Sequence, residues 1–308
     1  MSRSTVPSRP SRARRVLRWA GRVTAGVVAL LCVAGAAVYG LSERRMRAHF
    51  DVAEHPLAIT SDSATLARGR HLAAIHGCTE CHGPALGGRV LLENAAIGRI
   101  AAPNVSVGGR GAALTPADWE RAVRHGLRRD GSPLLFMPAH EFAGAADDEV
   151  AAIVAFALSL PAQHTTVPPM APGPLARALF LTGQIALVPA ERIDQAAPHA
   201  AHVVVAPDSA YGAHLAAGCI GCHGPTYAGG KIPGTPPDWP PAPNLTPTGI
   251  GRWTLDDFER ALREGRRPDR SPIRPPMPLG ATRQMTDVEL EALWAYLRTL
   301  PPRPTGTR

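Results

Sequence analysis

Two copies of one short cysteine-histidine pattern constrain this chain more than any other feature. Residues 78–82 read Cys-Thr-Glu-Cys-His, and residues 219–223 read Cys-Ile-Gly-Cys-His. In a C-x-x-C-H motif the two sulfurs form thioether bonds to the edge of a porphyrin, and the adjacent histidine is placed beneath the iron. The sequence therefore predicts two covalently bound haem c groups, held by Cys78, Cys81 and His82 and by Cys219, Cys222 and His223.

A tetrahedral zinc site built from both motifs is the competing interpretation. The residues that follow each motif argue against it. Met137, followed by proline, lies 55 residues after His82, and Met277, also followed by proline, lies 54 residues after His223. A thioether is a poor zinc ligand but the usual sixth ligand of iron in an electron-transfer haem. We therefore predict that Met137 and Met277 are the axial ligands opposite the two histidines.

One histidine offers an alternative to the first methionine. His140 lies three residues after Met137 and could replace it as the sixth ligand. The second copy has Gly280 at the matching position, so this alternative would not apply there. We expect His140 to be a surface group.

The amino terminus combines a basic tail with an apolar run. Residues 1–22 contain seven arginines and no acidic residue, and without them 26 Lys and Arg stand against 25 Asp and Glu. Residues 23–41 are uncharged and long enough to cross a hydrocarbon core of about 30 Å as a helix. This pattern predicts a single-pass inner-membrane anchor with a cytoplasmic tail and a periplasmic body, and it argues against nucleic-acid binding. A cleaved signal peptide is the alternative, although the apolar run is longer than usual for one.

Internal similarity extends beyond the two motifs. Residues 69–74 match 212–217, and residues 115–126 match 254–265, with offsets between 139 and 143. One domain has therefore been duplicated. Thr-x-x-Asp capping patterns and apolar residues at helical spacing predict short helices in each copy. The Gly- and Pro-rich segment after each motif is expected to be a long irregular loop ordered by the haem.

These features together resemble the class I cytochrome c fold. The resemblance implies an all-α protein with two tandem class I cytochrome c domains, preceded by one N-terminal transmembrane helix. The expected segments are a basic cytoplasmic tail (1–22), a transmembrane anchor (23–41), a linker (42–62), cytochrome c domain 1 (63–163), a Pro-rich linker with a short helix (164–206) and cytochrome c domain 2 (207–308).

The exported part is similar to membrane-anchored dihaem cytochromes related to the cytochrome subunits of bacterial membrane-bound alcohol and gluconate dehydrogenases. Those subunits usually carry three haem motifs, whereas this chain carries two. The resemblance also implies that a loop carbonyl accepts a hydrogen bond from each ligating histidine. The candidates are Pro103 and Pro243, or Pro84 and Pro225.

With both axial positions of each iron filled, no substrate could bind there. We therefore expect an electron carrier without catalytic residues rather than an enzyme. The expected donor is a dehydrogenase or quinol-oxidising complex, and the expected acceptor is an oxidase or a soluble cytochrome. A haem enzyme, such as a dihaem peroxidase or a thiosulfate-oxidising cytochrome, is the alternative, and it would need an open iron position with acid-base groups nearby.

Overall fold

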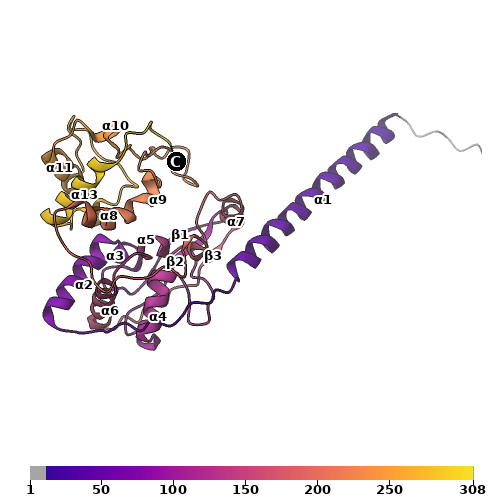
Figure 1. The fold of residues 1–308 in the computed structure, drawn as a ribbon. Helices are drawn as coiled ribbons and strands as arrows, with labels where there is room; N and C mark the ends of the chain where they lie inside the picture. Colours follow the sequence, from indigo (N-terminus) through magenta and orange to yellow (C-terminus); the bar gives the residue numbers. More distant parts are fainter. Residues whose placement is uncertain (1–11, 308) are drawn as a thin grey trace, which may run out of the picture.

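A long N-terminal helix precedes two helical domains in the computed structural model, which describes residues 12–307 (Figure 1). Helix α1 (Arg12–Met46) extends the predicted apolar segment at both ends. Its most apolar window has a mean hydropathy of 2.0 and none of it is buried against the protein, so α1 is long and apolar enough to cross a membrane. The predicted tail lies partly outside the described residues, because only residues 12–22 belong to α1.

The two domains repeat one order of elements, with a short helix at each cysteine-histidine motif. The first domain contains α2 (Ser63–Ile75), α3 (Cys78–His82), η1 (Gly111–Ala113), α4 (Pro116–Glu120), η2 (Arg121–His125), α5 (Ala139–Phe142) and α6 (Asp147–Ser159). The second contains α8 (Ser209–Ala216), η4 (Ala217–Cys219), α9 (Ile220–His223), α10 (Pro247–Ile250), α11 (Leu255–Glu264), α12 (Leu279–Thr282) and α13 (Asp287–Thr299). The repeat found in the sequence is therefore also a structural repeat.

The predicted capping boxes begin the middle helix of each domain. Thr115 caps α4 and accepts a hydrogen bond from the Asp118 backbone, and the Asp118 carboxylate accepts one from the Thr115 backbone in return. Thr254 and Asp257 make the same exchange at α11. Each pair satisfies two backbone N–H groups that the first turn leaves without partners, which fixes where the helix starts.

The first and last helices of each domain cross at a glycine. A Cβ at Gly69 in α2 would overlap with the Ala152 carbonyl of α6, and a Cβ at Gly212 in α8 would overlap with the Ala292 carbonyl of α13. Only a residue without a side chain allows the helix backbones to approach this closely. The crossings lie against the two domain cores, whose centres include Val150 and Val154 in the first and Leu290 and Leu293 in the second.

A small three-stranded antiparallel sheet departs from the all-α prediction, although the protein is mostly helical. Strands β1 (Arg89–Asn94) and β2 (Gly98–Ala102) form a hairpin within the segment expected to be irregular, and β3 (Ala171–Pro172) from the interdomain linker pairs with β2. The Asn94 side chain accepts hydrogen bonds from the backbone of Ala96 and Ile97 at 3.0 and 2.8 Å, and Gly98 has a φ of 81°. These turn contacts close the hairpin.

The linker also fixes the end of α1 to the first domain. It contains α7 (Pro174–Leu181) and η3 (Pro189–Arg192). Arg45 of α1 lies 4.0 Å from the ring centroid of Phe180, and its guanidinium binds Glu191 at 2.5 Å. Arg177 of α7 binds Glu43 at 2.9 Å. The predicted linker helix therefore packs against the protein, with Phe180 buried.

The crossing glycine of the first domain provides a test of this packing. Gly69→Ala should destabilise the protein by roughly 1–3 kcal/mol, because the new methyl group would force α2 away from α6. Urea unfolding followed by far-UV circular dichroism measures the change. Gly144→Ala is the matched control, since a Cβ there meets no atom within 4 Å. Equal stabilities of the two variants would contradict the close crossing.

Candidate functional site

A single cavity of about 2020 Å³ extends across both domains. We call it the shared cavity. It is lined by apolar side chains such as Leu86, Val105, Leu245 and Leu293. All eight residues predicted from the sequence line it, namely Cys78, Cys81, His82, Met137, Cys219, Cys222, His223 and Met277.

The ring N–H of each motif histidine has a defined acceptor. His82 Nδ1 lies 2.9 Å from the Pro103 carbonyl oxygen, and His223 Nδ1 lies 2.8 Å from that of Pro243. Between the two pairs of prolines considered from the sequence, the structure selects Pro103 and Pro243. Because a carbonyl can only accept, each Nδ1 carries the proton and leaves the Nε2 lone pair available for a metal.

The zinc interpretation does not survive this arrangement. Among residues 12–307, the one group of three or more His, Cys, Asp or Glu residues with ligand atoms within metal-binding distance contains no cysteine. The two motifs therefore do not converge on a tetrahedral site.

Two buried nitrogen atoms test whether a haem fits the shared cavity. Trp119 Nε1 and His140 Nδ1 have no hydrogen-bond partner among the described residues, and both side chains line the cavity. A buried donor without an acceptor costs about 1–3 kcal/mol. The carboxylates of a haem are acceptors of the required kind, so the residues fit this cofactor. The expectation that His140 is a surface group is wrong, because α5 buries its Nδ1 at the cavity wall.

The two domains contact each other through repeat-related pairs. His71 of α2 binds Glu289 of α13, with Nε2 2.7 Å from Oε1. His214 of α8 binds Glu149 of α6, with Nε2 2.8 Å from Oε2. His71 matches His214 in the sequence repeat, and Glu149 matches Glu289. The contact is therefore reciprocal, as in an isologous dimer interface.

Beside these pairs, each cysteine-histidine motif contacts the short helix that follows the predicted methionine ligand of the other domain, α5 after Met137 and α12 after Met277. We call these two stretches the methionine segments. A Cβ at Gly221, within the second motif, would overlap with the Glu141 carboxylate of α5. A Cβ at Gly280, in α12, would overlap with the Glu80 carboxylate of the first motif. Because each glycine has no side chain, it leaves room for the glutamate carboxylate of the other domain. The close approach explains how both motifs come to line one cavity.

Two matches to known families cover most of the chain that follows α1. The model described as cytochrome c matches residues 209–301. The model described as cytochrome c oxidase, cbb3-type, subunit III matches residues 64–156. The chain contains two cytochrome c domains. They account for two covalently bound haem c groups, in agreement with the two motifs.

Relatives that match longer stretches of the chain are cytochrome c subunits. The chain is 28% identical to the cytochrome c subunit of a quinone alcohol dehydrogenase from Gluconacetobacter polyoxogenes, over 79% of this chain and 58% of the relative. It is 29% identical to the corresponding subunit from Gluconobacter oxydans, over 80% of this chain and 57% of the relative. A dihaem c-type cytochrome from Cereibacter sphaeroides is 40% identical over 20% of this chain and 21% of its own length. The chain thus spans less than two thirds of the alcohol dehydrogenase subunits it resembles.

Sequence reasoning missed several residues around these cytochrome c domains. The interdomain histidines were visible in the repeat as His71 and His214, but nothing in the sequence paired either with a glutamate of the other copy. Trp119 belongs to the core of domain 1, and its indole N–H also lies at the cavity wall, which its place on the apolar face of the middle helix does not reveal. Of the other methionines in the described residues, Met46 is buried, whereas Met170 and Met285 line the shared cavity.

Glu141 yields a prediction about pH. Burial at the domain contact raises its pKa from 4.5 to about 7. The folded protein therefore holds a proton that the unfolded chain loses above pH 4.5, so this carboxyl increasingly lowers stability from about pH 4.5 to about pH 7. Glu141→Gln removes that cost. It should exceed the wild type in unfolding free energy by about 1–3 kcal/mol at pH 8, with no gain at pH 4.5.

Urea unfolding at the two pH values measures this difference. Glu80→Gln is the control, because Glu80 is the other carboxylate that faces a glycine across the domain contact. Its unfolding free energy shows how much a Glu-to-Gln change at this contact alters stability. A stability difference between Glu141→Gln and the wild type that is the same at both pH values would contradict the prediction.

Proposed function

We propose that the protein is a dihaem electron carrier that passes electrons from a dehydrogenase or quinol-oxidising complex to an oxidase or a soluble cytochrome. The observation that supports this most strongly is the shared cavity, in which both motifs and both methionine segments line one continuous space. A cavity common to both domains suits transfer between two cofactors inside one chain.

In this proposal the two motifs hold the cofactors. Cys78 and Cys81 attach the first haem, and His82 binds its iron with Met137 opposite. Cys219 and Cys222 attach the second, with His223 and Met277 as axial ligands. The haems supply reversible one-electron chemistry at iron. The hydrogen bonds to Pro103 and Pro243 orient the imidazoles and increase their basicity.

The membrane and the redox partners belong to the same proposal. Helix α1 acts as a single-pass inner-membrane anchor, and its arginine-rich start favours a cytoplasmic N-terminus with both domains in the periplasm. The names of the alcohol dehydrogenase relatives support a dehydrogenase as donor. Because α1 ends in contacts with α7 and η3, the anchor would also fix how domain 1 faces the membrane.

Methionine substitutions test the axial ligands. Met137→Ala and Met277→Ala should each remove about half of the methionine-iron charge-transfer absorption of the oxidised protein, and each should allow one haem to bind carbon monoxide when reduced. Met170→Ala and Met285→Ala are the controls, because these methionines also line the shared cavity. They should leave the spectrum unchanged. Retention of the full band in Met137→Ala or in Met277→Ala would refute the assignment of that methionine.

Carbon monoxide binding to the wild type also separates the carrier from the alternative. A haem enzyme with an open iron position would bind carbon monoxide stoichiometrically at that haem before any substitution. The carrier proposed here should bind little, since both irons have two protein ligands.

The reciprocal histidine-glutamate pairs make a second prediction. In Glu149→Gln/Glu289→Gln the contact between domains should loosen, because each charge-assisted hydrogen bond contributes about 1.5–3 kcal/mol. Electron exchange between the haems after rapid partial reduction should then slow, while the spectrum of each haem stays the same. Stopped-flow or flash reduction measures the exchange. An unchanged rate would contradict a role of this contact in electron transfer.

The same contact should depend on pH in a defined direction. The Glu289 carboxylate raises the pKa of His71 above 6.5, so their interaction is fully present below pH 6.5 and is lost as pH rises through the pKa of the folded protein. The pKa of Glu289 lies below 4.5, which sets the lower limit. The effect of Glu289→Gln on the exchange rate should therefore be largest between about pH 4.5 and 6.5.

A further inference from the structure

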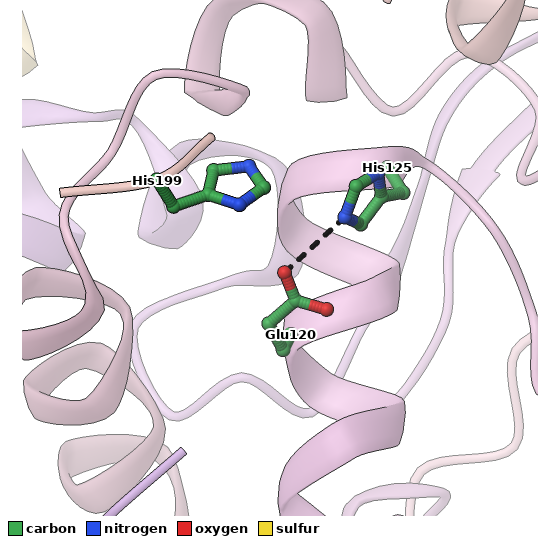
Figure 2. Close-up of side chains that lie close together, drawn as sticks. All are labelled: Glu120, His125 and His199. Atoms are coloured by element: carbon green, nitrogen blue, oxygen red, sulfur yellow. Dashed lines mark ion pairs between the residues drawn. The ribbon is translucent and has the colours of Figure 1, made fainter. Parts of the chain in front are cut away.

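A second cluster of ligand-type side chains lies outside the shared cavity. Glu120 and His125 come from the middle helix of domain 1, and His199 comes from the interdomain linker. Their ligand atoms all lie within 4.8 Å of one another. Figure 2 shows the Glu120 carboxylate directed toward the space between the two imidazole rings. Glu120 and His125 are only 1% and 3% exposed, and His199 is half-buried, so two of the three side chains lie inside the protein.

A local distortion of the helix brings two of these side chains together. In a regular α-helix, residues five apart point roughly 140° away from each other around the axis. Here α4 continues into a π-helical turn, η2, and His125 Nε2 lies 3.3 Å from Glu120 Oε1. Domain 2 has Glu264 in place of His125, and α11 is an undistorted helix. The π-turn and the histidine thus occur together in one domain only, and such turns are frequent at functional sites.

A glutamine fixes the proton on His125. Gln195 Nε2 donates to the carbonyl oxygen of Ala190 at 3.0 Å and approaches that of His125 at 3.4 Å. Its amide oxygen therefore faces the ring, at 2.6 Å from His125 Nδ1. Because an amide oxygen only accepts, Nδ1 carries the proton. In the neutral ring the Nε2 lone pair points at a carboxylate oxygen 3.3 Å away, an arrangement that a cation between the two atoms would satisfy.

The charged side chains around the cluster carry a net negative charge that a bound cation would balance. Arg124 is fully buried, and its guanidinium binds Asp147 at 2.7 Å and approaches Glu120 at 3.3 Å. Asp147 therefore balances Arg124, and the charge of Glu120 remains.

We propose that Glu120, His125 and His199 form a zinc site that fastens the interdomain linker to domain 1. Two imidazoles and one carboxylate are a zinc ligand set, with one coordination position left for water. Tetrahedral donors at about 2.0–2.2 Å from zinc lie roughly 3.3–3.5 Å apart, so the group has to contract slightly. The linker backbone is already held at this point, because the Ala200 carbonyl accepts a hydrogen bond from Asp147 N at 2.9 Å. A rotation of the His199 ring can therefore close the site.

Zinc binding to the full-length, dihaem protein in detergent tests the proposal. The protein carries no polyhistidine tag, is treated with a chelator and is then equilibrated with Zn²⁺ against a zinc indicator. The expected result is one zinc ion per chain. Zinc-edge X-ray absorption should report two imidazole nitrogens and a carboxylate oxygen at about 2.0–2.2 Å. The haem irons do not interfere, because the measurement is specific to zinc.

Linker variants locate the site. His199→Ala should abolish stoichiometric binding, whereas His202→Ala, in the same linker and 79% exposed, should retain it. Gln195→Ala removes only the group that orients His125, and it should weaken binding about 10- to 100-fold. Unchanged haem spectra and zinc-free unfolding curves show that each variant is folded.

Two outcomes would overturn the site. One is less than stoichiometric zinc on the wild-type protein at saturating Zn²⁺. The other is equal binding by His199→Ala and His202→Ala, which would place any bound zinc elsewhere. If His199→Ala did not fold, Glu120→Gln would take its place as the ligand variant, since it preserves the shape of the side chain, and full zinc binding by Glu120→Gln would refute the proposal.

Discussion

The buried carboxylates of Glu149 and Glu289 each cap their own helix and each bind a histidine of the other domain. The arrangement of the two domains depends on these interactions. Glu149 and Glu289 are 1% and 3% exposed. Glu149 accepts a hydrogen bond from Ala146 N at the start of its own helix, and Glu289 accepts one from Thr286 N. Each carboxylate also binds a histidine of the other domain, and Glu289 accepts a longer hydrogen bond from Tyr211 at 3.4 Å. Removing that histidine would leave a buried charge with too few partners, which is costly.

This requirement couples the start of a helix to the contact between domains. In an isolated domain, α6 or α13 could be capped as it is here, but the carboxylate would have to face water. With the second copy present, the same carboxylate is buried and helix α2 or α8 of the other copy is held against it. Duplication therefore provided, in each domain, a histidine that binds the helix-capping carboxylate of the other domain. The shared cavity follows, because this contact places the two motifs on facing surfaces.

The positions at which the copies differ can be understood from this contact. Glu80 of the first motif corresponds to Gly221 of the second, and His140 corresponds to Gly280. Each glycine gives space to a glutamate from the other domain, Glu141 at Gly221 and Glu80 at Gly280. Two identical copies would bring side chains together at both places. The two copies are thus complementary at this interface, where identical copies would clash. The two domains can approach closely only because their sequences differ at these positions.

Much of the fold could be predicted from the sequence because its determinants are local. The capping boxes at Thr115 and Thr254 and the motif helices depend on residues within four positions of each other. The hairpin of β1 and β2 was missed because the long segment has no alternating pattern, and Asn94 and Gly98 decide the turn. The pairings of His71 with Glu289 and of His199 with Glu120 join residues 218 and 79 positions apart, and only the tertiary fold determines such neighbours.

The attachment of α1 completes the asymmetry between the domains. The contacts of Arg45 with Glu191 and Phe180, and of Arg177 with Glu43, join the helix to the linker that also packs on domain 1. Strand β3 of the same linker extends the sheet of domain 1, and Asp147 and Asp148 at the start of α6 bind the backbone of Ala200 and Ala201. Domain 1 is therefore held by α1 and the linker together, whereas domain 2 is held through its contacts with domain 1 and through linker residues Gln184 and Ile185, which lie against Gly234. Loosening the histidine-glutamate pairs would weaken the hold on domain 2 and leave the contacts of α1 in place, because those contacts involve only the linker.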